Sequence, residues 1–160
     1  MSDARFEDAR GGPLRLRALD AEDLTLISGL VQDSVFPITE ARYDRARRRF
    51  GLLLNRIRRE DRAVAEGRAV ERVRTVLVFD DVMAVRRSGL DPAERDLVLS
   101  LLSVTFEPGE DGTGRVVLTL AGDGAIALEV ESLDCTLRDV TQPYRAPSGR
   151  LPDHKEADDV

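Results

Sequence analysis

The sequence predicts an α+β domain in which two capped helices cover a mostly antiparallel sheet, strongly curved or forming a partly open barrel. Three observations support this fold class. Apolar and polar residues alternate in several short segments, turn signals separate these segments closely, and two aspartates stand where helix N-caps belong. Strands joined by turns rather than by helices favour antiparallel pairing over a doubly wound parallel sheet.

The first helix is predicted to begin at Asp20, directly after a short alternating strand over residues 14–17. Asp20 can cap the helix, and acidic residues in the first turn suit the helix dipole. Its apolar side chains recur at helical spacing: Leu24, Ile27, Leu30 and Val31. The helix should end near Asp33, because the residues before Pro37 avoid the helical region.

The next predicted elements are strands. Residues 49–57 alternate and can pair with residues 40–43 across a turn at 44–48, and residues 60–71 form a charged loop or a short exposed helix. The β-branched segments 72–79 and 82–87 predict a hairpin closed by the two-residue turn Asp80-Asp81.

A second helix is predicted to start at Asp91, with Pro92 at its first position and Glu94 completing a capping box. Leucine and valine then occupy five of the six positions 97–102, all except Ser100, which is typical of a buried helix. Beyond it, residues 104–106 and two segments around the turn 122–124, residues 116–120 and 126–130, are predicted strands. Residues 133–140 fit a helix or a strand equally well. The expected core includes Leu52, Val78, Leu97, Leu101, Phe106, Leu118 and Leu128.

Two stretches, residues 19–54 and 90–118, follow the same order of elements: capped helix, short aromatic strand, proline-containing loop and arginine-led strand. An internal duplication explains this order, and so does chance, since Leu-Asp before a helix is common capping chemistry. Residues 1–12 are predicted to be a flexible N-terminal arm, 13–142 a single α+β domain, and 143–160 an acidic C-terminal tail that contains prolines.

Composition indicates the cellular compartment and argues against one class of function. The one cysteine, Cys135, cannot form an intramolecular disulfide, and no apolar run is long enough for a signal peptide or a membrane span, so we expect a soluble cytoplasmic protein. The net charge of -6 is unlike that of a bulk nucleic-acid coat.

No catalytic residue, metal site or cofactor is predicted. Cys135 has no histidine in the predicted domain to act as its base, since the one histidine, His154, lies in the tail. The acidic loop around Glu107, Glu110 and Asp111 lacks the alternating oxygen ligands of a calcium loop. The glycines at 112 and 114 are not followed by the Lys-Ser/Thr of a phosphate-binding loop.

The strongest local charge lies between Arg42 and Arg62, where nine arginines stand against three acids. Guanidinium groups bind phosphate and carboxylate through paired donors. The candidate anion- or partner-binding residues are Arg45, Arg47, Arg48, Arg49, Arg56 and Arg58. We expect their strand at a sheet edge, and if Arg56 and Arg58 share one face of it, they should lie beside the 45–49 turn. Candidate partners are an acidic protein surface, another copy of the chain and a polyanion; sequence-specific nucleic-acid binding is disfavoured because aromatic residues are scarce. A merely solubilising charged edge is the plainer alternative.

Three segments, residues 50–56, 99–109 and 121–130, resemble a family of small uncharacterised bacterial proteins found mainly in alphaproteobacteria. The resemblance covers about residues 4 to 154 and implies a stand-alone cytoplasmic protein, without an assigned activity. We therefore expect a non-catalytic binding or regulatory domain, with a homo-oligomer among its candidate states. A small enzyme acting on an anionic metabolite is the alternative.

Overall fold

The structure, a computed structural model, describes residues 12–58, 71–140 and 144–145. In this part of the chain it contains eleven strands, one α-helix and two short 3-10 segments. The elements in chain order are β1 (Arg15–Ala18), α1 (Ala21–Val31), β2 (Ser34–Pro37), η2 (Ile38–Glu40), β3 (Ala41–Asp44), β4 (Arg49–Ile57), β5 (Glu71–Phe79), β6 (Val82–Ser88), β7 (Val98–Pro108), η3 (Glu110–Gly112), β8 (Gly114–Leu120), β9 (Ala125–Val130), β10 (Cys135–Asp139) and β11 (Tyr144–Arg145).

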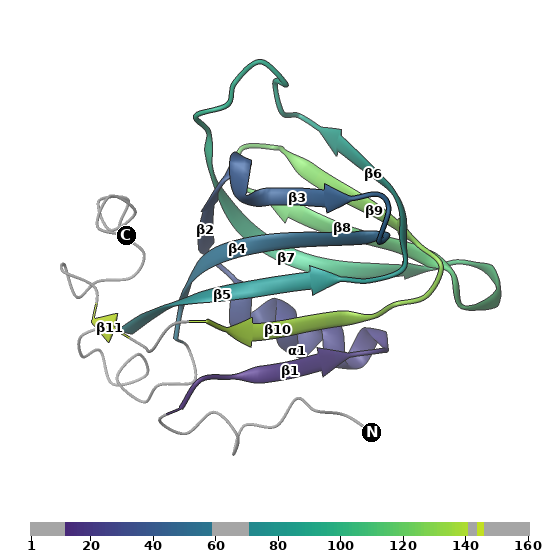
Figure 1. The fold of residues 1–160 in the computed structure, drawn as a ribbon, viewed down its shortest axis with the longest axis horizontal. Helices are drawn as coiled ribbons and strands as arrows, with labels where there is room; N and C mark the ends of the chain where they lie inside the picture. The colour runs from purple at the N-terminus through teal and green to yellow at the C-terminus, as the bar shows by residue number, and fades with distance from the viewer. Residues whose placement is uncertain (1–11, 59–70, 141–143, 146–160) are drawn as a thin grey trace.

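All the strands belong to one sheet with the order β1-β10-β5-β4-β2-β7-β8-β9-β6, while β11 pairs with β5 and β3 pairs with β4. Every registered pairing is antiparallel. The sheet is open and strongly curved (Figure 1), so that β6 approaches the turn between β3 and β4. There Val82 N–H donates to the Arg48 carbonyl at 2.8 Å. The prediction of a mostly antiparallel α+β fold is therefore confirmed.

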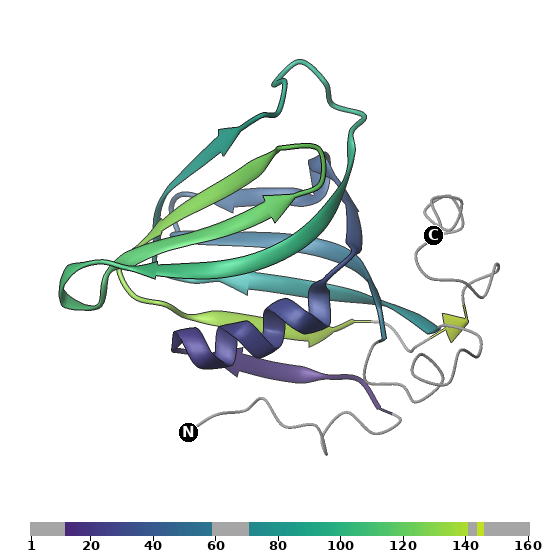
Figure 2. The same cartoon turned by 180° about the vertical axis from the view of Figure 1, so that it is seen from behind.

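The helix α1 lies on the inner face of the curved sheet (Figure 2). Asp20 caps it as predicted, because its carboxylate accepts the Asp23 N–H at 2.9 Å. The apolar stripe of the helix is buried: Leu24, Ile27, Leu30 and Val31. This face closes the core, where facing residues of four strands form continuous rows. One such row consists of Leu52, Leu77, Leu137 and Leu16.

The second predicted helix does not exist: residues 91–96 form a turn, and Val98–Pro108 is the long strand β7. The capping chemistry at Asp91 is real but local, because its carboxylate accepts the Ala93 N–H at 2.9 Å and its carbonyl accepts the Glu94 N–H at 3.0 Å. A short apolar run cannot distinguish helix from strand by periodicity. Residues 98–108 adopt the strand conformation because they pair with β2 on one side and with β8 on the other. The internal duplication, which needed a second capped helix, is wrong in that form.

The predicted hairpin over residues 72–87 is also wrong, although both of its strands exist. The edges of β5 are occupied by β4 and β10, and β6 pairs with β9 instead. A type I′ hairpin turn needs positive φ at both central residues, whereas only Asp81 has it, with φ 59°. The Asp80-Asp81 segment is therefore a corner that carries the chain to another part of the sheet.

Other local predictions are confirmed. Residues 49–57 form β4, residues 41–44 pair with it as β3, and β8 and β9 form the predicted hairpin. Residues 133–140, left open between helix and strand, contain the strand β10. Of the expected core, four leucines are buried and Val78, Leu97 and Phe106 are half-buried; the buried ones are Leu52, Leu101, Leu118 and Leu128.

The expected domain boundaries are only partly covered by the described residues. Residues 1–11 of the predicted arm, most of the 60–71 segment and most of the predicted tail lie outside them. Paired backbone continues to Arg145, because β11 pairs with Glu71 and Arg72 of β5. Regular structure thus reaches beyond residue 142.

Candidate functional site

Four of the predicted site residues, Arg45, Arg47, Arg48 and Arg49, lie at the β3–β4 turn. Three of them are held by nearby carboxylates: Arg47 by Asp44 at 3.8 Å, Arg48 by Glu131 at 3.0 Å and Arg49 by Asp80 at 2.8 Å. The hydrogen bond to Asp80 raises the pKa of Arg49, with its charge adding to the effect. Arg45 is exposed and forms no ion pair with the described residues. The turn therefore carries less free positive charge than its composition suggests.

Arg56 is at the other end of β4 and its side chain is fully buried. Its Nε and Nη2 donate to the two Asp139 carboxylate oxygens at 3.1 and 2.9 Å. Nε also lies 3.0 Å from the Thr75 hydroxyl, which donates to Asp139 at 2.7 Å, and the Leu14 N–H donates to the same carboxylate at 2.8 Å. This closed network holds β4, β5, β10 and the start of β1 together, and it withdraws Arg56 from the surface.

Arg58 is buried beside Arg56, and its Nη1 donates to the Glu71 carboxylate at 2.8 Å. The prediction that Arg56 and Arg58 lie beside the 45–49 turn is wrong, because Arg49 begins the nine-residue strand β4, whereas Arg56 and Arg58 lie at its opposite end. The predicted edge position is wrong too, since β4 lies between β5 and β2 in the interior of the sheet. Arginines within an apolar strand can be buried in the core when a carboxylate forms an ion pair with them there.

The structure gathers a different set of arginines on the outer face of the sheet. Facing residues of adjacent strands form two rows across this face. The first row is Arg17, Thr136, Val78, Gly51 and Arg42, and the second is Arg15, Arg138, Val76 and Leu53. Arg49 and Arg74 lie on the same side, two residues along from Gly51 and Val76. We call the six outward residues Arg15, Arg17, Arg42, Arg49, Arg74 and Arg138 the arginine face.

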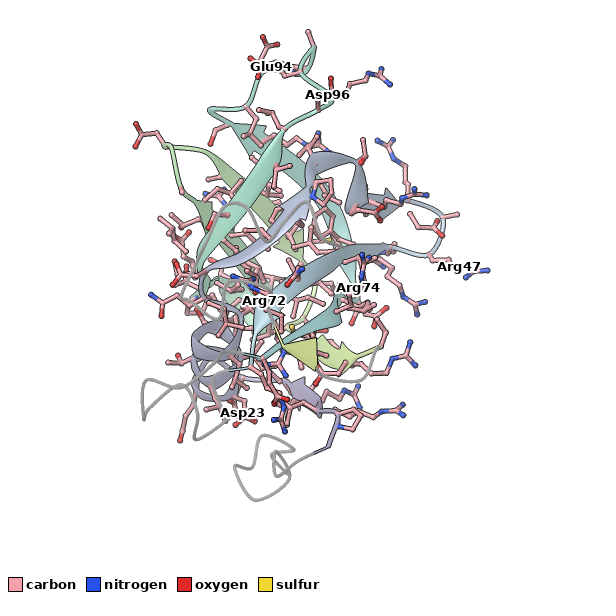
Figure 3. The ribbon with its side chains drawn as sticks, turned by 90° about the vertical axis from the view of Figure 1, so that its left-hand side faces the viewer. Asp23, Arg47, Arg72, Arg74, Glu94 and Asp96 are labelled. Carbon is pink, nitrogen blue, oxygen red and sulfur yellow. The ribbon has the colours of Figure 1, made fainter. Side chains whose placement is uncertain are left out.

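Three members of the arginine face are exposed and form no ion pair with any described residue: Arg15, Arg42 and Arg138. Arg15 and Arg138 stand directly opposite each other on β1 and β10, where like charges are unfavourable. Arg17 is neutralised by Asp134 at 2.9 Å. In Figure 3, nitrogen-tipped side chains line the right-hand margin, where Arg47 projects. The face therefore concentrates uncompensated positive charge on a chain whose net charge is -6.

Sequence reasoning missed Arg15, Arg17, Arg74 and Arg138 because it searched for charge in one continuous window. A usable signal was present in the alternation of residues 14–17, where each buried leucine is followed by an arginine. Period-2 alternation places both arginines on one face of a strand. It does not say which other strands share that face.

A cleft opens on the same outer face where β2 and β3 diverge along β4. β3 pairs with β4 as far as Leu52, and β2 pairs with it only at Asn55, so that Leu53 and Leu54 have no registered partner on that side. The cleft has a volume of about 280 Å³ and is lined by Val35, Phe36, Pro37, Glu40, Leu53, Leu54, Asn55, Arg74 and Val98. Its walls are mostly apolar, with one carboxylate, one amide and one guanidinium.

The polar groups of the cleft differ in how they are held. Asn55 is buried, and its amide oxygen accepts from the Arg72 Nη1 at 3.2 Å. Glu40 is half-buried, and its carboxylate has no hydrogen bond or ion pair with the part of the chain that the structure describes. Arg74, labelled in Figure 3, faces Asn55 across the β5–β4 pair and joins the cleft to the arginine face. The lining contains neither a histidine nor a thiol, the usual partners in nucleophilic catalysis.

Cys135 is a fully buried residue of β10 at the inner face. Burial, with a smaller contribution from Asp134, raises the pKa of its thiol, so the thiol is protonated and unreactive in the folded protein.

This burial predicts a pH dependence. Above about pH 8.5 the unfolded chain loses the thiol proton while the folded protein keeps it, so stability decreases as pH rises. We expect the free energy of unfolding to fall by up to about 1.4 kcal/mol per pH unit more in the parent than in Cys135→Ala. Urea titrations of both proteins between pH 8 and 10 measure the difference. Parallel pH profiles for the two proteins would contradict it.

The described residues contain no cluster of three or more His, Cys, Asp or Glu side chains that could hold a metal ion. Glu110 and Asp111 of the acidic loop lie in η3, and Glu107 is in β7. In the same part of the chain, no helix has the length and apolar character needed to cross a membrane.

Comparisons with known proteins give a family but no activity. No curated protein matches the chain significantly, and no solved structure does. A family model described as "Protein of unknown function (DUF2948)" matches residues 14–154, which include the eleven strands and the α-helix of the described residues. The expected resemblance to a family of uncharacterised proteins is thereby confirmed, and the chain belongs to the DUF2948 family.

Proposed function

We propose that this protein is a non-catalytic binding domain whose arginine face holds an anionic partner. The observation that carries the proposal is the position of Arg15, Arg42 and Arg138, which project from three strands onto one face without a carboxylate partner among the described residues. Guanidinium groups left without partners on a folded surface are free to form paired hydrogen bonds with carboxylate or phosphate oxygens.

Several exposed arginines elsewhere on the surface are neutralised by carboxylates, whereas Arg45, Arg86, Arg87 and Arg95 form no ion pair with the described residues. On the outer side of β8 and β9, Arg115 is neutralised by Glu129 at 2.7 Å. The turn arginines Arg47 and Arg48 are likewise paired. Positive charge is thus compensated at these places and left uncompensated on the arginine face. Such a field attracts anions over a distance of about 10 Å at 0.1 M salt.

The proposal predicts that the substitutions Arg15→Gln, Arg42→Gln and Arg138→Gln together weaken polyanion binding. Each exposed pair contributes about 0.2–1 kcal/mol, so three together should lower the affinity about tenfold. The probe is a fluorescein-labelled oligoglutamate, measured by fluorescence anisotropy at low salt and again at about 1 M salt, where binding should be largely lost.

A matched control is available on β6 and in the turn that precedes β7. Arg86, Arg87 and Arg95 are exposed and form no ion pair with the described residues. Changing all three to glutamine removes the same charge, and the affinity should stay within about twofold. Equal losses in the two triple variants would reduce the effect to net charge and overturn the proposal. Elution volumes of the parent at low and high salt report whether the anionic partner is a second copy.

A further inference from the structure

We infer that the partner of the arginine face is an extended acidic segment of a protein, which places one apolar side chain in the cleft between β2 and β3. This inference rests on the proposed function and adds to it the chemical class of the partner. The cleft is a part of the surface on which the proposed anion binding by the arginine face does not depend.

The cleft and the arginine face are one continuous surface. Leu53 of the cleft stands in the same cross-strand row as Arg15, Arg138 and Val76. Arg74 belongs to both, since it projects outward from β5 and lines the cleft. A ligand that reaches from Arg15 to the cleft crosses β1, β10, β5 and β4. At about 4.8 Å between strands, this distance corresponds to roughly five residues of extended peptide.

The cleft suits an apolar side chain rather than a second anion. Its walls include Pro37, Leu53 and Val98, and Val98 is 56% exposed, the most exposed large apolar residue in the described part of the chain. The volume of about 280 Å³ lies at the lower end of the range for ligand pockets, enough for one or two side chains. A half-buried carboxylate in the wall, Glu40, repels an anion and can accept an N–H from a peptide backbone.

The composition of the surface favours a protein over a nucleic acid. Arginines around half-buried aliphatic side chains such as Val76 and Val78 are typical of protein interfaces. Single-stranded nucleic acids bind to aromatic stacking platforms, and the two rows of the outer face contain no aromatic residue. The Glu40 carboxylate would also lie close to a phosphate backbone that followed this path.

The test is a selection of phage-displayed random peptides of about 12 residues on the full chain, more than twice the length that crosses the face. We expect enriched peptides to combine several Asp or Glu residues with one aliphatic or aromatic residue at a constant position. The tightest peptide is then synthesised with a fluorescent label and measured by anisotropy against variants of the protein.

Two variants of β7 distinguish a specific effect on binding at the cleft from a general effect of placing a charge on the strand. Val98→Glu places a charge at the mouth of the cleft and should weaken the selected peptide about tenfold or more, the value of burying one large aliphatic side chain. Leu102→Glu is the matched control, because Leu102 is also exposed on β7 but does not line the cleft. Its affinity should stay within about twofold of the parent.

The outcomes distinguish this inference from the proposed function. Acidic peptides without a constant apolar residue, or equal binding by Val98→Glu and the parent, would overturn the cleft inference and leave the anion-binding face. A selection that enriches no peptide would also overturn the cleft inference. So would an oligouridylate RNA that binds more tightly than the peptides, if its affinity falls in the triple variant of Arg15, Arg42 and Arg138. Enriched peptides that are not acidic and bind this triple variant as tightly as the parent would overturn both.

Discussion

Replacing Asp139 with alanine is expected to lower the free energy of unfolding by about 3–5 kcal/mol. The Asp139 carboxylate accepts hydrogen bonds from Arg56, Thr75 and the Leu14 backbone, and its pair with Arg56 is fully buried. Removing the carboxylate leaves the Arg56 guanidinium charged in the core and the Leu14 N–H without its acceptor. Urea denaturation followed by circular dichroism measures the loss, since the chain has no tryptophan.

An exposed ion pair near the same strand provides the control. Asp134 precedes β10 and pairs with the half-exposed Arg17 at 2.9 Å. Asp134→Ala should cost less than about 1 kcal/mol, because solvent screens an exposed pair. The double variant Arg56→Met with Asp139→Leu should recover much of the loss, since the buried ion pair is then replaced by two apolar side chains. Equal costs for Asp134→Ala and Asp139→Ala would contradict the assigned role of the network.

Truncating Leu101 to alanine is expected to cost about 2–5 kcal/mol. Leu101 is fully buried in β7, facing Ser34 of β2 and Leu120 of β8. The substitution removes apolar contacts and leaves a cavity that strands paired on both sides cannot easily close. The next residue, Leu102, is 41% exposed, and Leu102→Ala should change stability by about 0.5 kcal/mol or less. If both variants unfold at the same urea concentration, the alternation of β7 is incorrect.

Leu101 also shows how burial and secondary structure are predicted with different success. Its burial follows from hydrophobicity alone and was predicted correctly, although the element around it was predicted to be a helix. The capping signals at Asp91 and Pro92 are local and were satisfied by one turn of backbone. The conformation of residues 98–108 depended on β2 and β8, which lie far away in the sequence. Local propensity is a weak prior when tertiary pairing is available.

The candidate site illustrates the same division. A window of arginines in the sequence predicted one surface patch. In the structure these arginines lie at the two ends of β4, and Arg56 and Arg58 are buried. The arginine face combines Arg15 of β1, Arg42 of β3 and Arg138 of β10, which lie in three separate parts of the sequence. The order of the strands in the sheet brings these arginines onto one face, so no single segment of the sequence predicts their proximity.

Elements with local causes could be predicted from the amino-acid sequence. These are the capped helix α1, the strand over residues 49–57, the β8–β9 hairpin and the burial of the central leucines. Each depends on interactions between residues close in the chain or on hydrophobicity. Long-range contacts determine the other features: β5 pairs with β10 and not with β6, β7 is a strand, and the arginines of β1, β3 and β10 share one face. Strand pairing is non-local: the backbone hydrogen bonds of any strand can be satisfied by many partners, and the packing of the whole sheet selects among them.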